Sequence, residues 1–409
     1  MRILYVTQIV PYPPHGGVLQ RGYNLLRELG SRHEVHLLAF HHRDELPPGE
    51  PVEQSRRELG RFCRSVEYFD LWPKRSVIHR LAGLAAAALH PAPFSVLAHR
   101  SGQLSRRLSA ICHGAQAPDI VHLDTIALAP YANDCGDLPV VLAHHNIESQ
   151  LMQRRAEFER GWLQRRYVGR EAAKLRQFEA QVAGRFLSNI TVSDADAGAL
   201  GQICPGAVTD VIPNGVDTDY FTPRRGQETS TLVFTGGMNM FANRDGVDWF
   251  LESVWPAIKA RVPDARFVAI GQRPSERLRQ AVGRDSFVEA PGFVQDVRPA
   301  VARAAVYIVP LRVGGGTRLK VLDAMAQGKA IVSTALGAEG LDVHDGVHLV
   351  LADDARSFAD RVVYLLQHPD ERLRLGDAAR KKAELKYSWA ILGERLAGVY
   401  ARAIEGARR

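Results

Sequence analysis

A glycine-rich loop followed by charged side chains is the strongest chemical signal in this sequence. Within VPLRVGGGTRLKVLDAMAQGKAIVST (309–334), an apolar run is followed by Gly314, Gly315 and Gly316 and then by Thr317. Glycines let a backbone approach a ligand closely, and Thr317 can cap a helix that begins there. The free N–H groups at a helix start bind anions. The loop is therefore predicted to hold an anionic group such as a diphosphate.

The first turn of the expected helix carries Arg318 and Lys320. Cations at a helix N-terminus oppose the helix dipole by about 0.3–1 kcal/mol each, a cost that a bound diphosphate would offset. Lys320 and Asp323 are three residues apart and share a helix face. A cation for phosphate and a carboxylate for a ribose or sugar hydroxyl would thus point together. The alternative interpretation is a glycine-rich turn with ordinary surface charges.

Two series of short apolar segments, separated by helical patterns, must position this loop. The first series of expected strands comprises residues 3–7, 34–40, 65–71, 119–124, 139–146 and 189–193. The second series comprises residues 231–237, 265–271, 286–292, 305–310, 329–334 and 347–353. Strands without polar alternation are typical of parallel sheets covered by helices on both faces. The sequence therefore predicts an α/β protein with two doubly wound, Rossmann-like domains facing each other across a cleft.

Composition narrows the class of protein. The 409 residues are 46% hydrophobic and 24% charged, which excludes a largely disordered chain. The four cysteines are far apart and form no C-x-x-C pair, so neither a disulfide framework nor a cysteine zinc site is expected. The N-terminus MRILYVTQIV lacks a cleavage site, and no apolar run is long enough to span a bilayer. We expect a cytoplasmic protein, and the net charge of +7 is too evenly distributed to indicate a nucleic-acid partner.

Two segments concentrate positive charge. Between Asp70 and Asp119 there is no acidic residue. This stretch contains the basic residues Lys74, Arg75, Arg80, Arg100, Arg106 and Arg107. Apolar residues between 77 and 89 fall on one helical stripe, so residues 74–107 are predicted to contact an anionic membrane surface. The alternative is an ordinary packed helix. A continuous helix is expected over 148–186, with eight Arg or Lys residues against three Glu within 154–176.

Other polar motifs carry weaker signals. Asp217, Thr218 and Asp219 form a D-x-D, which can hold a metal ion through nucleotide phosphates, but it lies at the expected domain boundary. Adjacent side chains on a strand point to opposite faces, so the neighbouring pairs His41–His42 and His144–His145 are not expected to chelate one ion. No metal site is predicted.

Several ordered motifs resemble the retaining glycosyltransferases of family four, which have the GT-B architecture and include bacterial exopolysaccharide and cell-envelope sugar transferases. DAMAQGKAIVS resembles the second half of that family's signature, and VIPNGVDTDYFTP resembles the segment that opens its second domain. VPYPPHGGVLQRGYNLLREL, ITVSDADAGAL and FTGGMNMFANRDGVDWFLESVWP match other family segments in the expected order. The resemblance covers essentially the whole chain.

The resemblance implies roles for particular residues on the donor side. Asp323 stands at the second Glu of the signature, which generally holds the nucleotide ribose, and Gly315 replaces the first Glu, which usually contacts the donor sugar. Gly237 stands where the family often has an arginine, so Arg318 and Lys320 take more of the diphosphate. The complete set of expected donor-binding residues is Gly16, Gly17, Asn214, Gly237, Gly315, Gly316, Thr317 and Asp323.

On the acceptor side, DIVHLDT resembles the family's D-x-x-H-x-H strand end. His122 matches the first histidine and Asp124 the second, and residues two apart on a strand face the same side. Both are candidate catalytic residues together with Arg318 and Lys320, although a structural role is an equal alternative. His145, Asn146 and Glu148, at the end of the next strand, are weaker candidates.

The family implies a specific organisation and reaction. We expect an acceptor domain over 1–212, a donor domain over 213–387 and a terminal helix over 388–409 that crosses back to the first domain. The expected activity is metal-independent transfer of a hexose from a nucleoside-diphosphate sugar to a glycan or lipid-linked acceptor, with retention and no cofactor. Alternatives are a sugar-nucleotide epimerase of the same architecture and a non-catalytic sugar-nucleotide-binding protein. The expected location is cytoplasmic, peripheral on the inner face of the membrane.

Overall fold

The structure is a computed structural model of the chain. It describes residues 1–14, 17–43, 46, 49–71, 90–159, 161–224, 229–314 and 318–408. The chain divides into two compact units, of which unit 1 contains residues 1–213 and 392–409 and unit 2 contains residues 214–391. The boundaries thus fall after residues 213 and 391, where the sequence analysis placed them after 212 and 387. The last helix, α16 (Trp389–Ala407), begins in unit 2, where the backbone N–H of Trp389 donates to the Val216 carbonyl.

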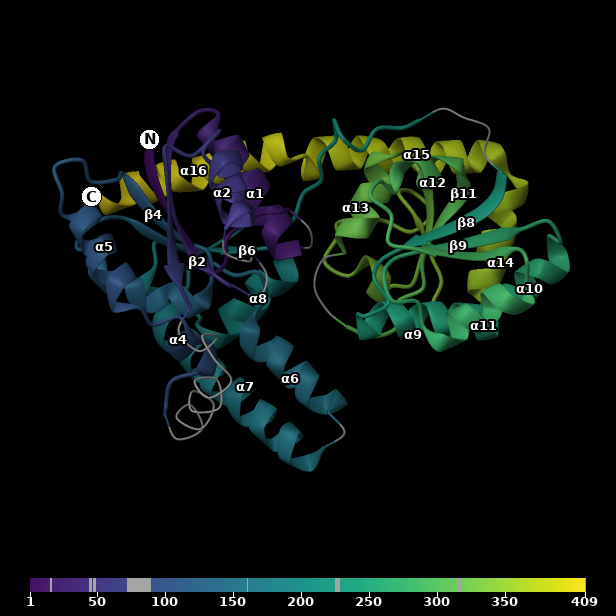
Figure 1. The fold of residues 1–409 in the computed structure, drawn as a ribbon, viewed down its shortest axis with the longest axis horizontal. Helices are drawn as coiled ribbons and strands as arrows, with labels where there is room; N and C mark the ends of the chain where they lie inside the picture. The colour runs from purple at the N-terminus through teal and green to yellow at the C-terminus, as the bar shows by residue number, and fades with distance from the viewer. Residues whose placement is uncertain are drawn as a thin grey trace. The chain divides into compact units, whose positions relative to one another are not determined.

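Unit 1 contains a seven-stranded parallel sheet in the order β3-β2-β1-β4-β5-β6-β7 (Figure 1). The strands are β1 (Arg2–Thr7), β2 (Glu34–His41), β3 (Ser65–Asp70), β4 (Ile120–Leu123), β5 (Val140–Ala143), β6 (Ser188–Thr191) and β7 (Thr209–Val211). Strands β4 and β5 are buried along their whole length, which accounts for their mainly apolar sequences. Strand β6 is equally buried, although three of its four residues are polar. Strands β2 and β3 are added on one side of β1, and β4 to β7 are added on the other, so the strand order reverses between β1 and β4.

Helices connect these strands. They are α1 (Gly17–Gly30), α2 (Glu50–Leu59), α4 (Phe94–Ala98), α5 (Gly102–Cys112), η2 (Ile126–Asp134), α6 (Glu148–Phe158), α7 (Trp162–Val182), η3 (Ala183–Arg185) and α8 (Asp194–Ile203). The prediction of one continuous helix over 148–186 is wrong, because the chain breaks between α6 and α7. Glu159 and Gly161 have extended backbone angles there, and α7 folds back along α6 (Figure 1).

Unit 2 contains a six-stranded parallel sheet in the order β10-β9-β8-β11-β12-β13. The strands are β8 (Thr229–Thr235), β9 (Arg266–Ile270), β10 (Val288–Gly292), β11 (Ala304–Val309), β12 (Ala330–Ser333) and β13 (Val350–Leu351). The last strand is shorter than the predicted 347–353. In the turn before it, Asp345 and Leu349 form an isolated bridge. The predicted fold class, α/β with two Rossmann-like domains, is confirmed.

The helices of unit 2 cover both faces of its sheet (Figure 1). They are α9 (Phe241–Trp249), η4 (Phe250–Val254), α10 (Trp255–Arg261), α11 (Glu276–Arg284), α12 (Arg298–Arg303), α13 (Leu319–Ala326), η5 (Leu336–Ala338), α14 (Ala355–Gln367), α15 (Pro369–Lys382) and η6 (Ala383–Tyr387). Gly246 lets α9 approach the end of β11, since a methyl group there would lie 2.4 Å from the Pro310 carbonyl oxygen. This close packing brings the start of α9 beside the glycine-rich loop.

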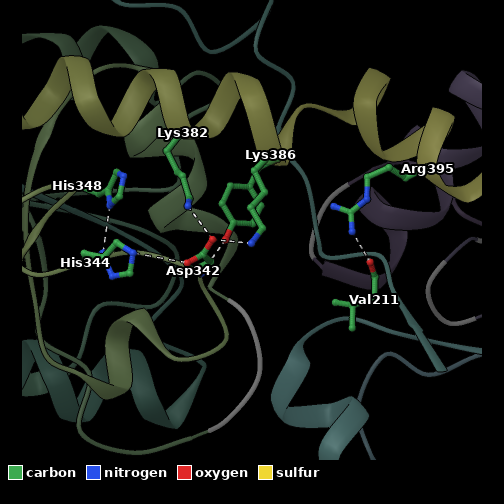
Figure 2. Close-up of polar contacts among 8 residues, drawn as sticks. Val211, Asp342, His344, His348, Lys382, Lys386 and Arg395 are labelled. Carbon is green, nitrogen blue, oxygen red and sulfur yellow. Dashed lines mark hydrogen bonds and ion pairs between the residues drawn. The ribbon is translucent and has the colours of Figure 1, made fainter.

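Charged contacts fix the loop after β12 within unit 2. Asp342 accepts hydrogen bonds from Lys382 Nζ at 2.7 Å and from Lys386 Nζ at 2.6 Å (Figure 2). These two lysines outweigh partial burial and hold the pKa of Asp342 well below its usual range. The loop is therefore attached to α15 and η6. Within unit 1, Arg395 of α16 donates to the Val211 carbonyl of β7 at 2.8 Å (Figure 2).

The segments predicted to contact a membrane are only partly described. No helix among the described residues is both long and apolar enough to cross a bilayer. The predicted amphipathic helix over 77–89, with Lys74, Arg75 and Arg80, lies outside the described residues. Arg107 forms a two-pronged ion pair with Glu67, with Nε–Oε2 and Nη2–Oε1 distances of 2.8 and 2.6 Å. Because Glu67 lies 40 residues before Arg107 and outside the acid-free stretch, counting charges within that stretch overstated the free positive charge at Arg107.

Candidate functional site

The sheet of unit 2 has its topological switch point between β8 and β11. From β8 the chain moves to β9 and β10 on one side, and then returns to β11 on the other side. The segments that follow the two strands, residues 236–240 and 310–314, therefore begin at the same edge of the sheet. Open α/β sheets bind ligands outside the carboxyl ends of strands at such a point. The glycine-rich loop predicted to bind a diphosphate is one of these two loops.

Lys320 is held over this edge by groups from three elements. It is the second residue of α13, and its Nζ donates to Asn243 Oδ1 of α9 at 2.8 Å. The same Nζ lies 4.1 Å from the centre of the Phe234 ring of β8. Gly236 permits this approach, because its φ of 147° suits glycine and a methyl group there would lie 2.5 Å from Nζ. The ammonium is thus fixed, and it forms no ion pair within the part of the chain that the structure describes.

Lys320 and Asp323 have opposite charges but both are poorly solvated. Burial and, to a smaller extent, the Arg318 guanidinium lower the pKa of Lys320 to about 7, against the opposing effect of Asp323. Burial likewise raises the pKa of Asp323 to about 7, with Lys320 opposing. Asp323 Oδ1 is buried and accepts no hydrogen bond from the described residues. A nearby anion would stabilise the charged lysine, and a hydroxyl donor would satisfy the carboxylate.

The structure brings part of the predicted donor-binding set together. Asn243 links Lys320 to Gly237, since its Nδ2 donates to the Gly237 carbonyl at 2.9 Å while its Oδ1 accepts from Lys320. Arg318 is the N-cap residue of α13 and packs against Gly314, where a methyl group would lie 3.1 Å from the guanidinium. Gly237, Arg318, Lys320 and Asp323 therefore surround the same edge of the sheet.

Six other residues were predicted to bind the donor. Gly16, Gly315, Gly316 and Thr317 lie outside the described residues. Gly17 is the exposed first residue of α1 in unit 1, and the half-buried Asn214 begins unit 2.

Asn243 and Gly236 were not among the residues predicted from the sequence. Asn243 lies 77 residues before Lys320, and no spacing rule connects the two positions. Gly236 stands in the quoted FTGGMNMF segment, where the paired glycines were visible but the lysine that requires the first of them was not.

In unit 1, His122 and Asp124 lie at the end of β4 in a buried polar network. His122 and Asp124 are 1% and 2% exposed. His122 Nδ1 lies 2.8 Å from the Tyr400 hydroxyl of α16, and its ring stacks on Tyr5 of β1 with centroids 4.1 Å apart. Tyr5 donates to Asp124 Oδ1 at 3.1 Å. His145 Nε2 lies 3.3 Å from Asp124 Oδ2, so this weaker candidate from the sequence joins the same network.

The electrostatics of this network favour the ionised form of Asp124. Burial acts to raise the pKa of Asp124, but His145 and His122 outweigh it and hold that pKa well below its usual range. Burial lowers the pKa of His122, with Asp124 opposing. Each oxygen of Asp124 has a partner. Of the two roles left open by the sequence, the burial and the hydrogen bonds favour the structural one for His122 and Asp124 themselves.

The other polar motifs have local partners. Asp217 Oδ1 accepts the backbone N–H groups of Asp219 and Tyr220 at 3.1 and 2.9 Å, which is a turn-capping arrangement. The adjacent histidines of each pair have different partners. His41 contacts the Leu46 carbonyl and His42 the Gln8 carbonyl. His144 contacts Asn189 while His145 contacts Asp124.

Two family models match the chain. The model of glycosyltransferase family 4 matches residues 15–220, half of the chain. The model of glycosyl transferases group 1 matches residues 229–368, which include the Lys320 site. The chain belongs to glycosyltransferase family 4. The family resemblance inferred from the motifs is thereby confirmed.

Solved structures of this family's architecture superpose on the whole chain. HepE from Anabaena, solved in complex with UDP, has a TM-score of 0.69 at 15% identity and covers 98% of this chain and 100% of its own. Sucrose-phosphate synthase from Thermosynechococcus elongatus has a TM-score of 0.69 at 15% identity, covering 99% and 100%. Each unit of this glycosyltransferase therefore has the Rossmann-like fold of a GT-B protein.

Two curated relatives match this chain over different shares of their length. A phosphatidyl-myo-inositol mannosyltransferase of Mycolicibacterium smegmatis is 30% identical over 240 residues, which span 55% of this chain and 59% of the relative. An uncharacterised 44.6 kDa protein in the cps region of Klebsiella pneumoniae is 23% identical over 380 residues, 88% of this chain and 90% of the relative. The match to the mannosyltransferase thus spans less than two thirds of that enzyme.

Proposed function

We propose that this family 4 glycosyltransferase transfers a hexose from a nucleoside-diphosphate sugar to a glycan or lipid-linked acceptor, in cell-envelope or exopolysaccharide synthesis. The observation that carries the proposal is the Lys320 ammonium. It is held by Asn243 over the switch point of unit 2, with no ion pair among the described residues. Such a cation at the start of a helix is suited to a diphosphate. The mannosyltransferase relative and the UDP complex of HepE agree with this substrate class.

The chemical task of these residues is to stabilise the leaving group. When the bond between the sugar and the diphosphate breaks, negative charge grows on the diphosphate while the sugar becomes oxocarbenium-like. Arg318, Lys320 and the N–H groups at the start of α13 are positioned to interact with that charge. Preorganised donors of this kind contribute about two to three orders of magnitude in rate. Asp323, whose Oδ1 accepts no hydrogen bond from the described residues, is proposed to hold a ribose hydroxyl.

On the acceptor side, we infer that His122 and Asp124 act as positioning residues. Asp124 is buried, with the Nε2 atoms of His122 and His145 at 3.5 and 3.3 Å from its oxygens, and we infer that its charge helps to orient both rings. His145 is the least buried of the three, with a side-chain exposure of 7% against 1% for His122 and 3% for Asp124, and we propose that it is the one nearest to a substrate. We further propose that transfer retains the anomeric configuration, as the motifs imply.

The decisive experiment offers the purified protein a panel of nucleoside-diphosphate sugars, with and without a lipid extract. If the protein transfers a sugar, a labelled sugar is expected to appear on an acceptor. The free nucleoside diphosphate is then expected to accumulate only when the extract is present. A free epimer without acceptor would indicate an epimerase instead. Saturable donor binding with no product of either kind would indicate a sensor.

We also propose that transfer needs no metal ion, because cations and backbone N–H groups already face the leaving group. Activity is therefore expected to persist in EDTA. Complete loss that magnesium or manganese restores would assign Asp217 and Asp219 a metal-binding role and contradict the proposal.

We propose a cytoplasmic location, peripheral on the inner face of the membrane, where a lipid-linked acceptor would be found. Residues 74–107 are proposed to contribute through their basic side chains, with Arg107 already neutralised by Glu67. Charge reversal at Lys74, Arg75 and Arg80 is expected to weaken binding to anionic vesicles. Unchanged binding would mean that this segment does not contact the membrane.

A further inference from the structure

Helices α6 and α7 form a hairpin that extends away from the sheet of unit 1 (Figure 1). Its base is anchored. Glu179 of α7 accepts the backbone N–H of Ser149 at 3.1 Å, and Glu171 accepts the backbone N–H of Phe94 at 2.8 Å. Leu175 and Val182 are buried on the same side of α7. These contacts fix the direction of the hairpin without involving its far end.

The far end is built differently. Residues 161–166, called here the hairpin tip, are all exposed. They include Trp162 and Leu163, whose exposed fractions are 71% and 64%. A tryptophan and a leucine side by side in solvent at the end of a projecting element are not explained by packing within this chain, since both could be polar without loss of core.

Cations accompany these apolar side chains on one face of α7. At 100° per residue, Trp162, Leu163, Arg166 and Arg170 fall within an arc of about 100°. The buried residues Val168, Leu175 and Val182 lie on the opposite side of the helix. Arg166 and Arg170 are exposed, and neither forms an ion pair within the described ranges of the chain. The solvent face of α7 therefore combines two large apolar groups with two uncompensated cations.

We propose that the hairpin tip, together with Arg166 and Arg170, docks onto an anionic lipid bilayer. Tryptophan is favoured at the membrane interface because its ring is apolar and its N–H polar, and arginines are attracted to anionic headgroups. Charge complementarity favours a bilayer over a second copy of this chain, because the same cations would face each other in a symmetric contact. The surface is separate from residues 74–107. It specifies the peripheral location and rests to that extent on the proposed function.

The test uses the full-length protein without donor or acceptor, so that a failure of the transfer proposal does not affect it. Co-sedimentation is measured with vesicles of phosphatidylcholine alone and with added phosphatidylglycerol. We expect Trp162→Ala/Leu163→Ala to weaken binding to the anionic vesicles about tenfold. Each arginine near such a surface contributes about fivefold, so Arg166→Glu/Arg170→Glu is expected to weaken binding at least about 25-fold. All four residues are exposed, so both variants are expected to keep the wild-type melting temperature.

Matched controls come from unit 2. Leu373→Ala/Leu385→Ala removes two leucines of 64% and 65% exposure, and Arg356→Glu/Arg361→Glu makes the same change in net charge on α14. Both controls are expected to bind vesicles as the wild type does. Lys320→Ala is expected to lose nucleotide binding but keep vesicle binding, which separates the two proposals.

Three results would overturn the inference. The first is an absence of wild-type binding to anionic vesicles at low salt. The second is unchanged binding in both hairpin variants while the variant reversed at Lys74, Arg75 and Arg80 loses it. The third is wild-type self-association that Trp162→Ala/Leu163→Ala abolishes without any change in vesicle binding, which would make the hairpin tip an interface between copies of this chain.

Discussion

Both units place a polar cluster near the point where their parallel sheet reverses strand order, and the two clusters are opposite in construction. In unit 1, Asp124 is 2% exposed and both of its oxygens have partners, in Tyr5, His122 and His145. In unit 2, Asp323 has a buried oxygen without a hydrogen bond from the described residues, and the nearby Lys320 has only a neutral acceptor in Asn243.

The pKa shifts express the same difference. The histidines hold the pKa of Asp124 well below its usual range despite burial, so the protein itself stabilises that charge. Burial raises the pKa of Asp323 to about 7 and lowers that of Lys320 to about 7, so the protein does not fully stabilise either charge. A carboxylate whose charge the protein itself stabilises contributes to the fold, whereas charges that the protein stabilises poorly can interact with the charges and hydroxyls of a ligand.

The largest expected effect concerns stability. Asp124→Ala leaves buried histidines and a tyrosine without their partner, and the free energy of unfolding is expected to fall by about 3–5 kcal/mol. Asp323→Ala is expected to change it by less than about 1 kcal/mol, because the removed carboxylate was itself poorly solvated. Urea unfolding followed by circular dichroism measures both, with the exposed Asp137→Ala as the control. Similar losses for the two variants would remove the distinction between the clusters.

The next effect concerns catalysis. Lys320→Ala or Arg318→Ala is expected to lower turnover by about two to three orders of magnitude, because each removes a cation facing the leaving diphosphate. The melting temperature is expected to stay close to that of the wild type. Steady-state rates with the donor identified from the panel provide the measurement, with Arg356→Ala as a matched loss of an exposed cation. Wild-type turnover in well-folded Lys320→Ala would contradict the proposal that this site binds the leaving diphosphate.

A third effect is a pH dependence of nucleotide binding. A bound diphosphate favours the ammonium form, so the pKa of Lys320 is higher in the complex than its value of about 7 in the free protein. The complex then holds an extra proton above pH 7, and affinity is expected to fall by up to about tenfold per pH unit. A ribose hydroxyl that donates to ionised Asp323 would lower the pKa of this carboxyl in the complex, so ionisation of Asp323 acts in the opposite direction and reduces the slope.

Calorimetry with UDP and with GDP between pH 7 and 9, in two buffers of different ionisation enthalpy, measures the proton uptake. Lys320→Arg keeps its charge throughout this range and is expected to show a smaller slope. Equal slopes in wild type and Lys320→Arg would mean that Lys320 is not the titrating group.

The smallest effect tests the support of the lysine. Asn243→Ala removes the acceptor of the Lys320 ammonium and the link to Gly237, and a lost hydrogen bond of this kind costs about 1 kcal/mol, or about fivefold in nucleotide affinity. The exposed Asn133→Ala serves as the control. If affinity is unchanged, Asn243 does not orient Lys320 in the complex.

The fold class and the proximity of Arg318, Lys320 and Asp323 could be predicted from the sequence alone. Unbroken apolar runs such as AVYIV in β11 predict strands buried on both faces, because local hydrophobicity decides whether a strand can face water. Arg318, Lys320 and Asp323 were found because they are close in sequence and share one helix. Local spacing is sufficient when the functional group of residues lies on one element.

Which charged side chains have partners from other elements could be seen only in the folded chain. Glu67 neutralises Arg107 from a neighbouring part of the fold, and Asn243 reaches Lys320 from a different helix. The break between α6 and α7 likewise places Trp162 and Arg166 on a projecting tip, where the sequence predicted one continuous helix. Hydrogen bonds and ion pairs depend on distances between elements, and the sequence pattern does not encode those distances.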